Sequence, residues 1–295
     1  MLQERASEKY TRWLLLLVAC SSLLTLGGIV LFLFMEGLPI FNSISITDFL
    51  LGSLWYPTDE PPLFGIFPLI TASLAVTVLA SALAVPLGVM TALYLAEIAP
   101  SAVRRVVKPF IELLAALPSV VIGFVGMVLI APLMQDWLVA ASGLNILNAA
   151  LMLAFMSVPT ICSVAEDALR AVPHSLREAS LALGATRWET LAQVVVPAAL
   201  SGIGTAIMLG MSRAIGETMV VLMVAGGAAI SPTSLLDPVR PMPASIAAEM
   251  AEAPFRDVHY HALFATGIVL FLLTLTFNVI AQRIAEKHQT SSSAC

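Results

Sequence analysis

Residues 166–197 read EDALRAVPHSLREASLALGATRWETLAQVVVP and separate two long apolar runs. Pro173 ends any helix that precedes it, because proline has no backbone N–H with which to continue a helix. Ser175 and Glu178 then have the S-x-x-E spacing of a capping box, which predicts a short helix. Gly184 follows at the place where helices commonly end in a left-handed residue.

A second helix is predicted directly after this glycine. Thr186 and Glu189 repeat the capping-box spacing, and the helix runs from Arg187 toward Val196, where Pro197 marks the entry into the next apolar run. Isolated helices this short are marginal in water, so we expect the pair to dock on another surface. An ordinary amphipathic loop resting on lipid is the other interpretation.

The apolar runs on either side belong to a series of six. Each reaches or approaches the ~20 residues that a membrane-spanning helix needs. The runs are residues 13–34, 69–96, 113–134, 145–165, 197–230 and 263–281. We therefore predict an all-α polytopic membrane protein with six transmembrane helices, in which residues 1–295 form a single transmembrane domain.

The composition agrees with this class and excludes others. Charged residues make up 11% of the chain, whereas a soluble domain carries about 25%. A hydrophobic content of 59% excludes a disordered chain. The net charge of -5 and the absence of a basic stripe argue against a nucleic-acid partner and leave membrane lipid as the surroundings.

The basic residues are sorted between the two sides of the membrane. Eleven of the 14 lie in the N-terminal tail, the second and fourth connections and the C-terminal tail. Two others, Arg240 and Arg256, lie in the fifth connection, and Arg213 lies inside a run. The positive-inside rule then places both termini and the even connections in the cytoplasm.

The fifth run carries two charges deep in its sequence, Arg213 and Glu217. These residues are at i and i+4, so we expect them to share a helix face, where they can pair. A charge near the middle of the membrane costs ~2.5–3.5 kcal/mol on insertion scales, and such charges commonly mark a substrate path. Arg213 could offer a fork of donors to an oxyanion, Glu217 could hold Arg213 or weaken anion binding, and Ser212 and Thr218 could add hydroxyls. A purely structural ion pair is the alternative.

The loop at 166–197 resembles the EAA loop of ABC-importer permeases, in which E-A-A is followed by three residues, a glycine, nine residues and I-x-L-P. Glu178, Ala179, Gly184 and Pro197 match at full spacing, and Ser180 replaces the second alanine. The resemblance implies the type I (MetI-like) importer permease fold. It also implies that this loop fits a groove on an ATPase subunit and couples closure of that subunit to the membrane helices.

Three further stretches resemble the phosphate-importer permeases of the PstC type. They are RAIGETMVVLMVAG at 213–226, LPSVVIG at 117–123 and VPLG at 85–88. This resemblance implies that Arg213 and Glu217 matter for phosphate passage. It further implies a bacterial inner-membrane location and three kinds of partner: a PstA-like permease, two PstB-like ATP-binding subunits and a PstS-like extracytoplasmic phosphate-binding protein.

The chain has no phosphate-binding loop of its own. A Walker A motif needs glycines before a lysine, and Lys9, Lys108 and Lys287 all lack that context. We therefore expect no enzymatic activity and no bound cofactor, with ATP and Mg²⁺ used by a partner ATPase. His259 and His261 have no evident third ligand, so we expect no metal site and solvated imidazoles.

Three other functions stay open at this point. A permease of the same class could carry another oxyanion, such as sulfate or molybdate. An ion-driven secondary transporter or channel would need no ATPase. A scaffold or sensor subunit would transport nothing.

Overall fold

The computed structural model describes residues 2–138 and 141–292. Residues 1, 139–140 and 293–295 of the predicted single domain lie outside the described residues. Within the described residues, six helical stretches are long and apolar enough to cross a membrane, and each overlaps one predicted run. These stretches are Thr11–Asn42, Phe67–Ile98, Ser119–Leu138, Ile146–Arg170, Arg187–Ile215 and Val258–Ile280. The predicted all-α membrane fold is confirmed.

Three long helices form the centre of the molecule: α3 (Phe67–Leu93), α7 (Ile146–Arg170) and α10 (Val196–Ile215). These helices approach closely because Gly88 and Gly210, which have no side chain, leave room for the side chain of Ile161. A Cβ at Gly88 of α3 would lie 2.8 Å from Ile161 Cβ, and one at Gly210 of α10 would lie 2.4 Å from Ile161 Cγ1. Small residues allow helices in a membrane to pack tightly where no water drives association.

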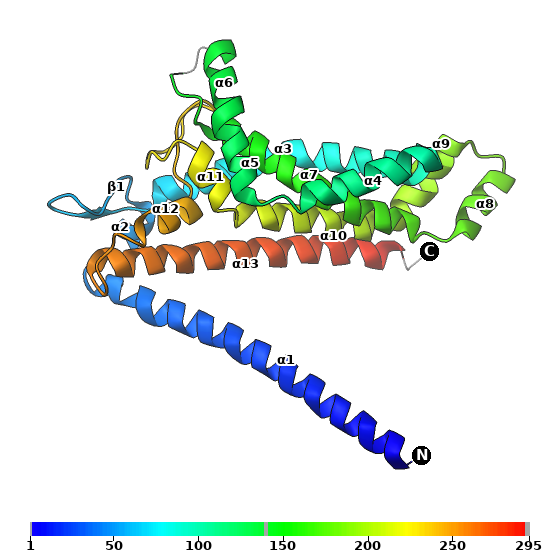
Figure 1. Cartoon of the computed structure of the whole chain (residues 1–295), viewed down its shortest axis with the longest axis horizontal. Helices are drawn as coiled ribbons and strands as arrows, with labels where there is room; N and C mark the ends of the chain where they lie inside the picture. The colour runs from blue at the N-terminus through cyan, green and yellow to red at the C-terminus, as the bar shows by residue number, and fades with distance from the viewer. Residues whose placement is uncertain (1, 139–140, 293–295) are drawn as a thin grey trace.

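The two terminal helices meet at one end of this bundle. In Figure 1, the last turns of α1 (Leu2–Gly37) lie against the first turns of α13 (Val258–Ser292). Toward the N-terminus, α1 diverges from α13. Phe32 and Phe264 stack edge to face with centroids 5.5 Å apart, and Gly37 lies against Ile268. The most apolar part of α1 has no buried residues, so it offers its surface to lipid or to another chain.

The end where α1 meets α13 also carries a small β-hairpin and is called here the hairpin end. After the turn η1 (Leu38–Asn42) and α2 (Ile46–Leu51), strands β1 (Trp55–Tyr56) and β2 (Leu63–Phe64) pair antiparallel, Trp55 opposite Phe64. The short helix α12 (Met242–Glu249) lies at the same end (Figure 1). The core of the hairpin end buries Phe49 and Trp55 almost completely.

The opposite end carries α8 (His174–Ala182) and α9 (Arg187–Thr190) and is called here the α8 end. The beginning of α1 and the end of α13 lie there too, as Figure 1 shows. The amphipathic helix α4 (Ser101–Ala115) leads back from this end into α5 (Ser119–Val125). The first turns of α1 and the last turns of α13 therefore lie at the same end as the predicted coupling loop.

Two helices contain π-turns placed directly before a proline. The turn η3 (Gly126–Ile130) precedes α6 (Ala131–Leu138) with Pro132, and η4 (Leu191–Val195) precedes α10 with Pro197. Proline lacks an N–H and clashes with the carbonyl four residues back, and the wider turn accommodates that clash. A third π-turn, η2 (Tyr94–Ile98), ends the membrane stretch begun by α3.

The predicted third span at 113–134 starts too early. Residues 113–115 close α4, and the membrane helix begins only at Ser119, after Pro118. The extended backbone of Pro118 (φ -60°, ψ 136°) separates the two helices. An apolar run that crosses a helix break cannot be divided by hydropathy alone, because both sides of the break are apolar.

Candidate functional site

The predicted fifth span at 197–230 is not one helix. It divides into α10, which ends at Ile215, and the short helix α11 (Met219–Val224). Gly216 leaves the helical path at φ -89°, ψ 1°. Beyond α11, Gly226 and Gly227 have φ of +97° and +73°, values that glycine adopts readily and other residues rarely do. The helix break at Gly216 therefore lies between Arg213 and Glu217.

The predicted pairing of Arg213 with Glu217 is wrong within the part of the chain that the structure describes. Arg213 donates from one terminal guanidinium nitrogen to Thr160 Oγ1 of α7, 3.3 Å away. Glu217 Oε1 instead accepts the backbone N–H groups of Met219 (3.2 Å) and Val220 (3.3 Å). Because the helix ends before Glu217, the i, i+4 spacing no longer places the two side chains on one face. The carboxylate instead caps the exposed start of α11.

The two predicted hydroxyls serve different neighbours. Ser212 Oγ donates to Asn278 Oδ1 of α13, so it faces a different helix from Arg213. Thr218 Oγ1 donates to the backbone oxygen of Gly216 at 3.4 Å and stays within its own turn. The four predicted path residues are thus close in sequence without converging on a single point.

A small cavity lies beside Glu217, on the bundle side of the break. Its volume is about 10 Å³, roughly the space that one water molecule occupies, so it is too small for a tetrahedral oxyanion. The cavity is lined by Ser73, Val76, Thr77, Leu153, Ala214, Ile215, Glu217, Val221, Pro241 and Pro243. The cavity is thus lined by Ser73 and Thr77 of α3 and by Glu217. Pro241, just before α12, and Pro243, within it, line the cavity too.

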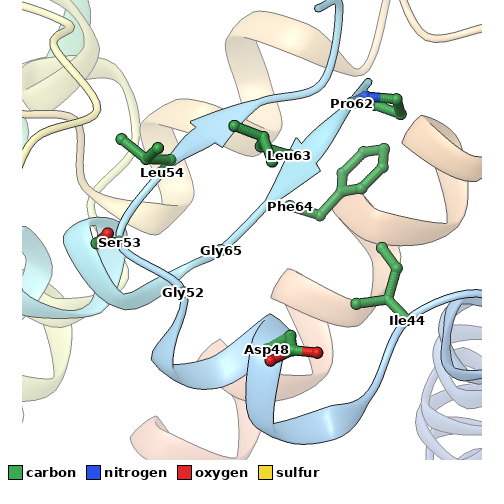
Figure 2. A pocket seen from close by; sticks show the side chains of 9 residues that line it. All are labelled: Ile44, Asp48, Gly52, Ser53, Leu54, Pro62, Leu63, Phe64 and Gly65. Atoms are coloured by element: carbon green, nitrogen blue, oxygen red, sulfur yellow. The ribbon is translucent and has the colours of Figure 1, made fainter. Parts of the chain in front are cut away.

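A larger cavity of about 290 Å³ opens on the hairpin (Figure 2). Its walls are lined by Ile44, Asp48, Gly52, Ser53, Leu54, Pro62, Leu63, Phe64 and Gly65. The one charged residue in this lining is acidic, so the cavity offers no cation to an oxyanion. We therefore place no anion site there.

The predicted two-helix loop is present, with one of its two capping boxes. Thr186 accepts the N–H of Glu189, and the Glu189 side chain accepts the N–H of Thr186, as predicted. Gly184 is left-handed, with φ +91°. The predicted box at Ser175 is absent because α8 begins at His174 with Pro173 as its N-cap, which puts Ser175 inside the first turn.

The remaining residues of the predicted motif differ in exposure. Glu178 and Ala179 are exposed. The hydroxyl of Ser180 lies 3.0 Å from that of Thr190 and joins α8 to α9. Pro197 does not interrupt the chain's entry into the membrane. The π-turn η4 lets the helix continue from α9 into α10.

An arginine that sequence reasoning missed holds α8 to the bundle. Arg177 donates to the backbone oxygens of Val172 (2.7 Å) and Leu169 (2.9 Å) and to Glu97 Oε1 (2.7 Å). The Leu169 carbonyl belongs to the last turn of α7, where helix geometry leaves acceptors unused, and Val172 follows the end of that helix. Its position directly before Glu178 was the one available signal.

A second ionic group at the α8 end was also missed. The carboxylate of Glu166 is almost fully buried and lies 3.2 Å from Lys108 Nζ and 3.5 Å from Arg170. Lys108 also reaches Asp167 at 3.0 Å. Burial lowers the pKa of Lys108, but its hydrogen bonds with Asp167 and Glu166 outweigh that effect and hold the pKa above its ordinary value of 10.5.

The hairpin end contains a further polar group. The expectation of a solvated His259 is wrong, because this side chain is buried and its Nε2 lies 2.9 Å from Glu249 Oε2. Glu249 also accepts from Trp55 Nε1 at 3.0 Å. No periodicity could have revealed this contact, because Trp55 and Glu249 are 194 residues apart in the chain.

Comparison with known proteins gives a consistent assignment. The family model described as "Binding-protein-dependent transport system inner membrane component" matches residues 84–289. The probable ABC transporter permease protein YqgH of Bacillus subtilis is 36% identical, with 93% of this chain and 90% of that protein covered. The phosphate transport system permease protein PstC of Mesorhizobium japonicum is 33% identical (88% and 84% covered), and PstC of Haemophilus influenzae is 33% identical (82% and 82%).

Solved structures agree on the fold. A bacterial alginate ABC transporter in complex with an alginate pentasaccharide-bound periplasmic protein superposes with a TM-score of 0.61, covering 90% of this chain and 93% of that one. The inward-facing MetNI methionine ABC transporter gives 0.58, covering 74% and 93%. Sequence identities of 15% and 17% limit these likenesses to the fold.

Proposed function

Because the chain belongs to the family of binding-protein-dependent transport system inner membrane components, we propose that it is the permease subunit of an ATP-driven importer of inorganic phosphate. As a family member it is a multi-pass inner-membrane protein and a translocation subunit. The observation that carries the choice of phosphate is the identity of 33% to PstC proteins over more than four fifths of the chain.

The loop at the α8 end supports coupling to an ATPase. Leu183 and Trp188 are 90% and 70% exposed, although both are apolar, and they flank the left-handed Gly184. Exposed apolar side chains on a polar face mark protein contact sites. We place the groove-binding surface here, with Glu178 and Ala179 on its exposed side.

ATP hydrolysis then belongs to separate subunits. This chain has no Walker A loop, so two PstB-like subunits would bind ATP and Mg²⁺. A second, PstA-like permease would complete the membrane pore, and a PstS-like phosphate-binding protein would deliver the anion at the hairpin end. With the ATPases at the α8 end, both termini of the chain lie in the cytoplasm.

Arg213 is the proposed contact for the passing anion. A guanidinium has five N–H donors in a planar fork, and Thr160 takes one of them. Glu217 is fixed by its bonds to α11, and its negative charge would keep the anion loosely bound. Ser212 and Thr218 would join the path only by leaving their present partners.

The cavity beside Glu217 measures about 10 Å³ and cannot hold the anion, so the pore would form together with the second permease. ATP binding would bring the two ATPases together, move α8 and change the side of the membrane to which the path is open. Hydrolysis and release would return the subunit to the opposite access.

Reconstitution of the complete transporter tests the proposal. Radiolabelled phosphate uptake into liposomes should need ATP, both permeases, the ATPase and the binding protein. Excess phosphate should compete with the label, and excess sulfate or molybdate should not. Arg213→Gln should abolish uptake while the complex still assembles, and Arg105→Gln, at an exposed site on α4, should not. Uptake without the ATPase subunits, or normal uptake by the Arg213 variant, would overturn it.

A further inference from the structure

The cavity of about 290 Å³ on the hairpin has no role in the transport cycle proposed above. All the residues that line it lie between positions 44 and 65. The first membrane stretch ends at Asn42 and the second begins at Phe67, so the whole lining belongs to the connection between them. The cavity therefore opens outside both membrane stretches, where a soluble protein can reach it.

The walls of this cavity are fixed by backbone contacts. Gly65 donates its N–H to the oxygen of Leu54, and Ile66 donates to the oxygen of Phe49, both at 2.8 Å. The backbones of Gly52 and Gly65 touch, because a Cβ at Gly65 would lie 2.4 Å from the carbonyl carbon of Gly52. A wall that is already ordered loses little conformational entropy when a partner binds.

The lining combines apolar side chains with one carboxylate. Leu54 and Leu63 are exposed, although both are apolar. Asp48 is exposed too, and its Oδ2 accepts from Ser45 Oγ at 2.7 Å. Figure 2 shows Asp48 on α2 and Leu63 on β2, so the acidic and the apolar parts come from different elements. A long cationic side chain suits this lining, because its methylene stem packs on apolar surface while its charged end pairs with a carboxylate.

The charge of the surrounding chain favours the same occupant. Residues 43–66 contain Asp48, Asp59 and Glu60 and no lysine, arginine or histidine. Such a surface repels a free phosphate and attracts the basic groups of a protein. Pockets that enclose drug-sized ligands measure ~300–1,000 Å³, so a cavity of about 290 Å³ suits one long side chain.

We propose that this cavity receives a lysine or arginine side chain of the extracytoplasmic phosphate-binding protein, with the charged end on Asp48 and the stem against Leu54 and Leu63. The inference rests on the proposed function, which supplies this partner and brings it to the hairpin end. The contact would fix the position of the binding protein without touching the transported anion.

The test measures the affinity of the binding protein for the assembled transporter. The complete transporter is held in lipid nanodiscs without ATP, and the phosphate-loaded binding protein of the same organism is titrated against it by biolayer interferometry. Asp48→Asn removes the charge but keeps an acceptor for Ser45, and it should raise Kd about tenfold, which corresponds to ~1.4 kcal/mol. Asp59→Asn is the matched control and should bind like the parent, because Asp59 is exposed on the same connection and does not line the cavity.

A second variant separates occupation of the cavity from general attraction between charges. Ser53→Trp fills the cavity and leaves the charge of Asp48 in place, and it should weaken binding at least as much. Parent affinity in an assembled Asp48→Asn or Ser53→Trp transporter would overturn the proposal. Loss of the second permease from the purified Asp48→Asn complex would also overturn it, because that chain would then be the occupant. Failure of the binding protein to bind the parent transporter would instead count against the proposed function.

Discussion

The contact between Arg177 and Glu97 predicts how α8 is linked to the membrane helices. Arg177 binds Glu97, the Leu169 carbonyl in the last turn of α7 and the Val172 carbonyl just after that helix, so one guanidinium connects α8 to both α7 and the π-turn that follows α3. The α3 helix in turn carries Ser73 and Thr77 at the small cavity. Movement of α8 should therefore be passed to α7 and α3 through this side chain.

The perturbation is a double-mutant cycle of Arg177→Lys and Glu97→Gln. Lysine keeps the charge but has no planar fork, so it cannot reach all three acceptors. The side chains are 15% and 20% exposed, which leaves the pair partly screened. Hydrogen bonds to charged groups contribute ~1.5–3 kcal/mol, and contacting pairs in such cycles interact by ~0.5–3 kcal/mol. We expect an interaction energy of about 1–2 kcal/mol.

Two measurements decide the matter: thermal stability of the assembled transporter, and phosphate transported per ATP hydrolysed. Each single variant should lower both, and the double variant should lose little more than the worse single one. Arg170→Lys is the control, because its ion pair with Glu166 spans 3.5 Å within one helix face and Arg170 is half exposed. Additive losses, or lower stability with an unchanged transport ratio, would refute the reasoning.

Three further predictions concern packing, charge and capping. Gly210→Ala should lower the free energy of unfolding by about 1–3 kcal/mol, because the new Cβ would lie 2.4 Å from Ile161 Cγ1. Gly216→Ala is the control and should change thermal unfolding far less, because the nearest atom to its new Cβ would be 3.8 Å away. Lys108→Met should destabilise the chain by leaving the buried carboxylate of Glu166 with a weaker partner set. Because the pKa of Lys108 is raised in the folded state, its contribution is present below pH 10.5 and is lost as the pH rises past the folded value, so parent and variant melting curves should converge there. Thr186→Ala should cost about 0.5–2 kcal/mol by removing the N-cap, and unchanged unfolding would contradict the capping role.

Local sequence patterns predicted the features that local physics controls. Apolar length located all six membrane stretches, because a helix that crosses lipid must be about 20 residues long whatever it packs against. The Thr186–Glu189 box and the left-handed Gly184 were predicted correctly, because each depends on neighbours within four residues. The beginning of α1 and the end of α13 lie at the same end as α8. That this end faces the cytoplasm stays a prediction from the distribution of basic residues.

The predictions failed where a helix had to continue or stop. Spacing alone treated Arg213 and Glu217 as partners on one helix, but the chain leaves the helix at Gly216 and Glu217 caps α11 instead. Ser175 has the residue spacing of a cap, yet the helix starts one residue before it. At Gly216 hydropathy could not reveal the break, because the run is apolar on both sides of it.

The sequence by itself determined the membrane class, the number of spans and the family motif, because these follow from residues close together in the chain. Only the tertiary structure decided which polar groups meet. Arg177 reaches Glu97 across 80 positions and Glu249 reaches Trp55 across 194, and such pairs carry no periodic signal. Buried polar groups need partners wherever the fold can supply them, so their identity is settled by packing and not by spacing.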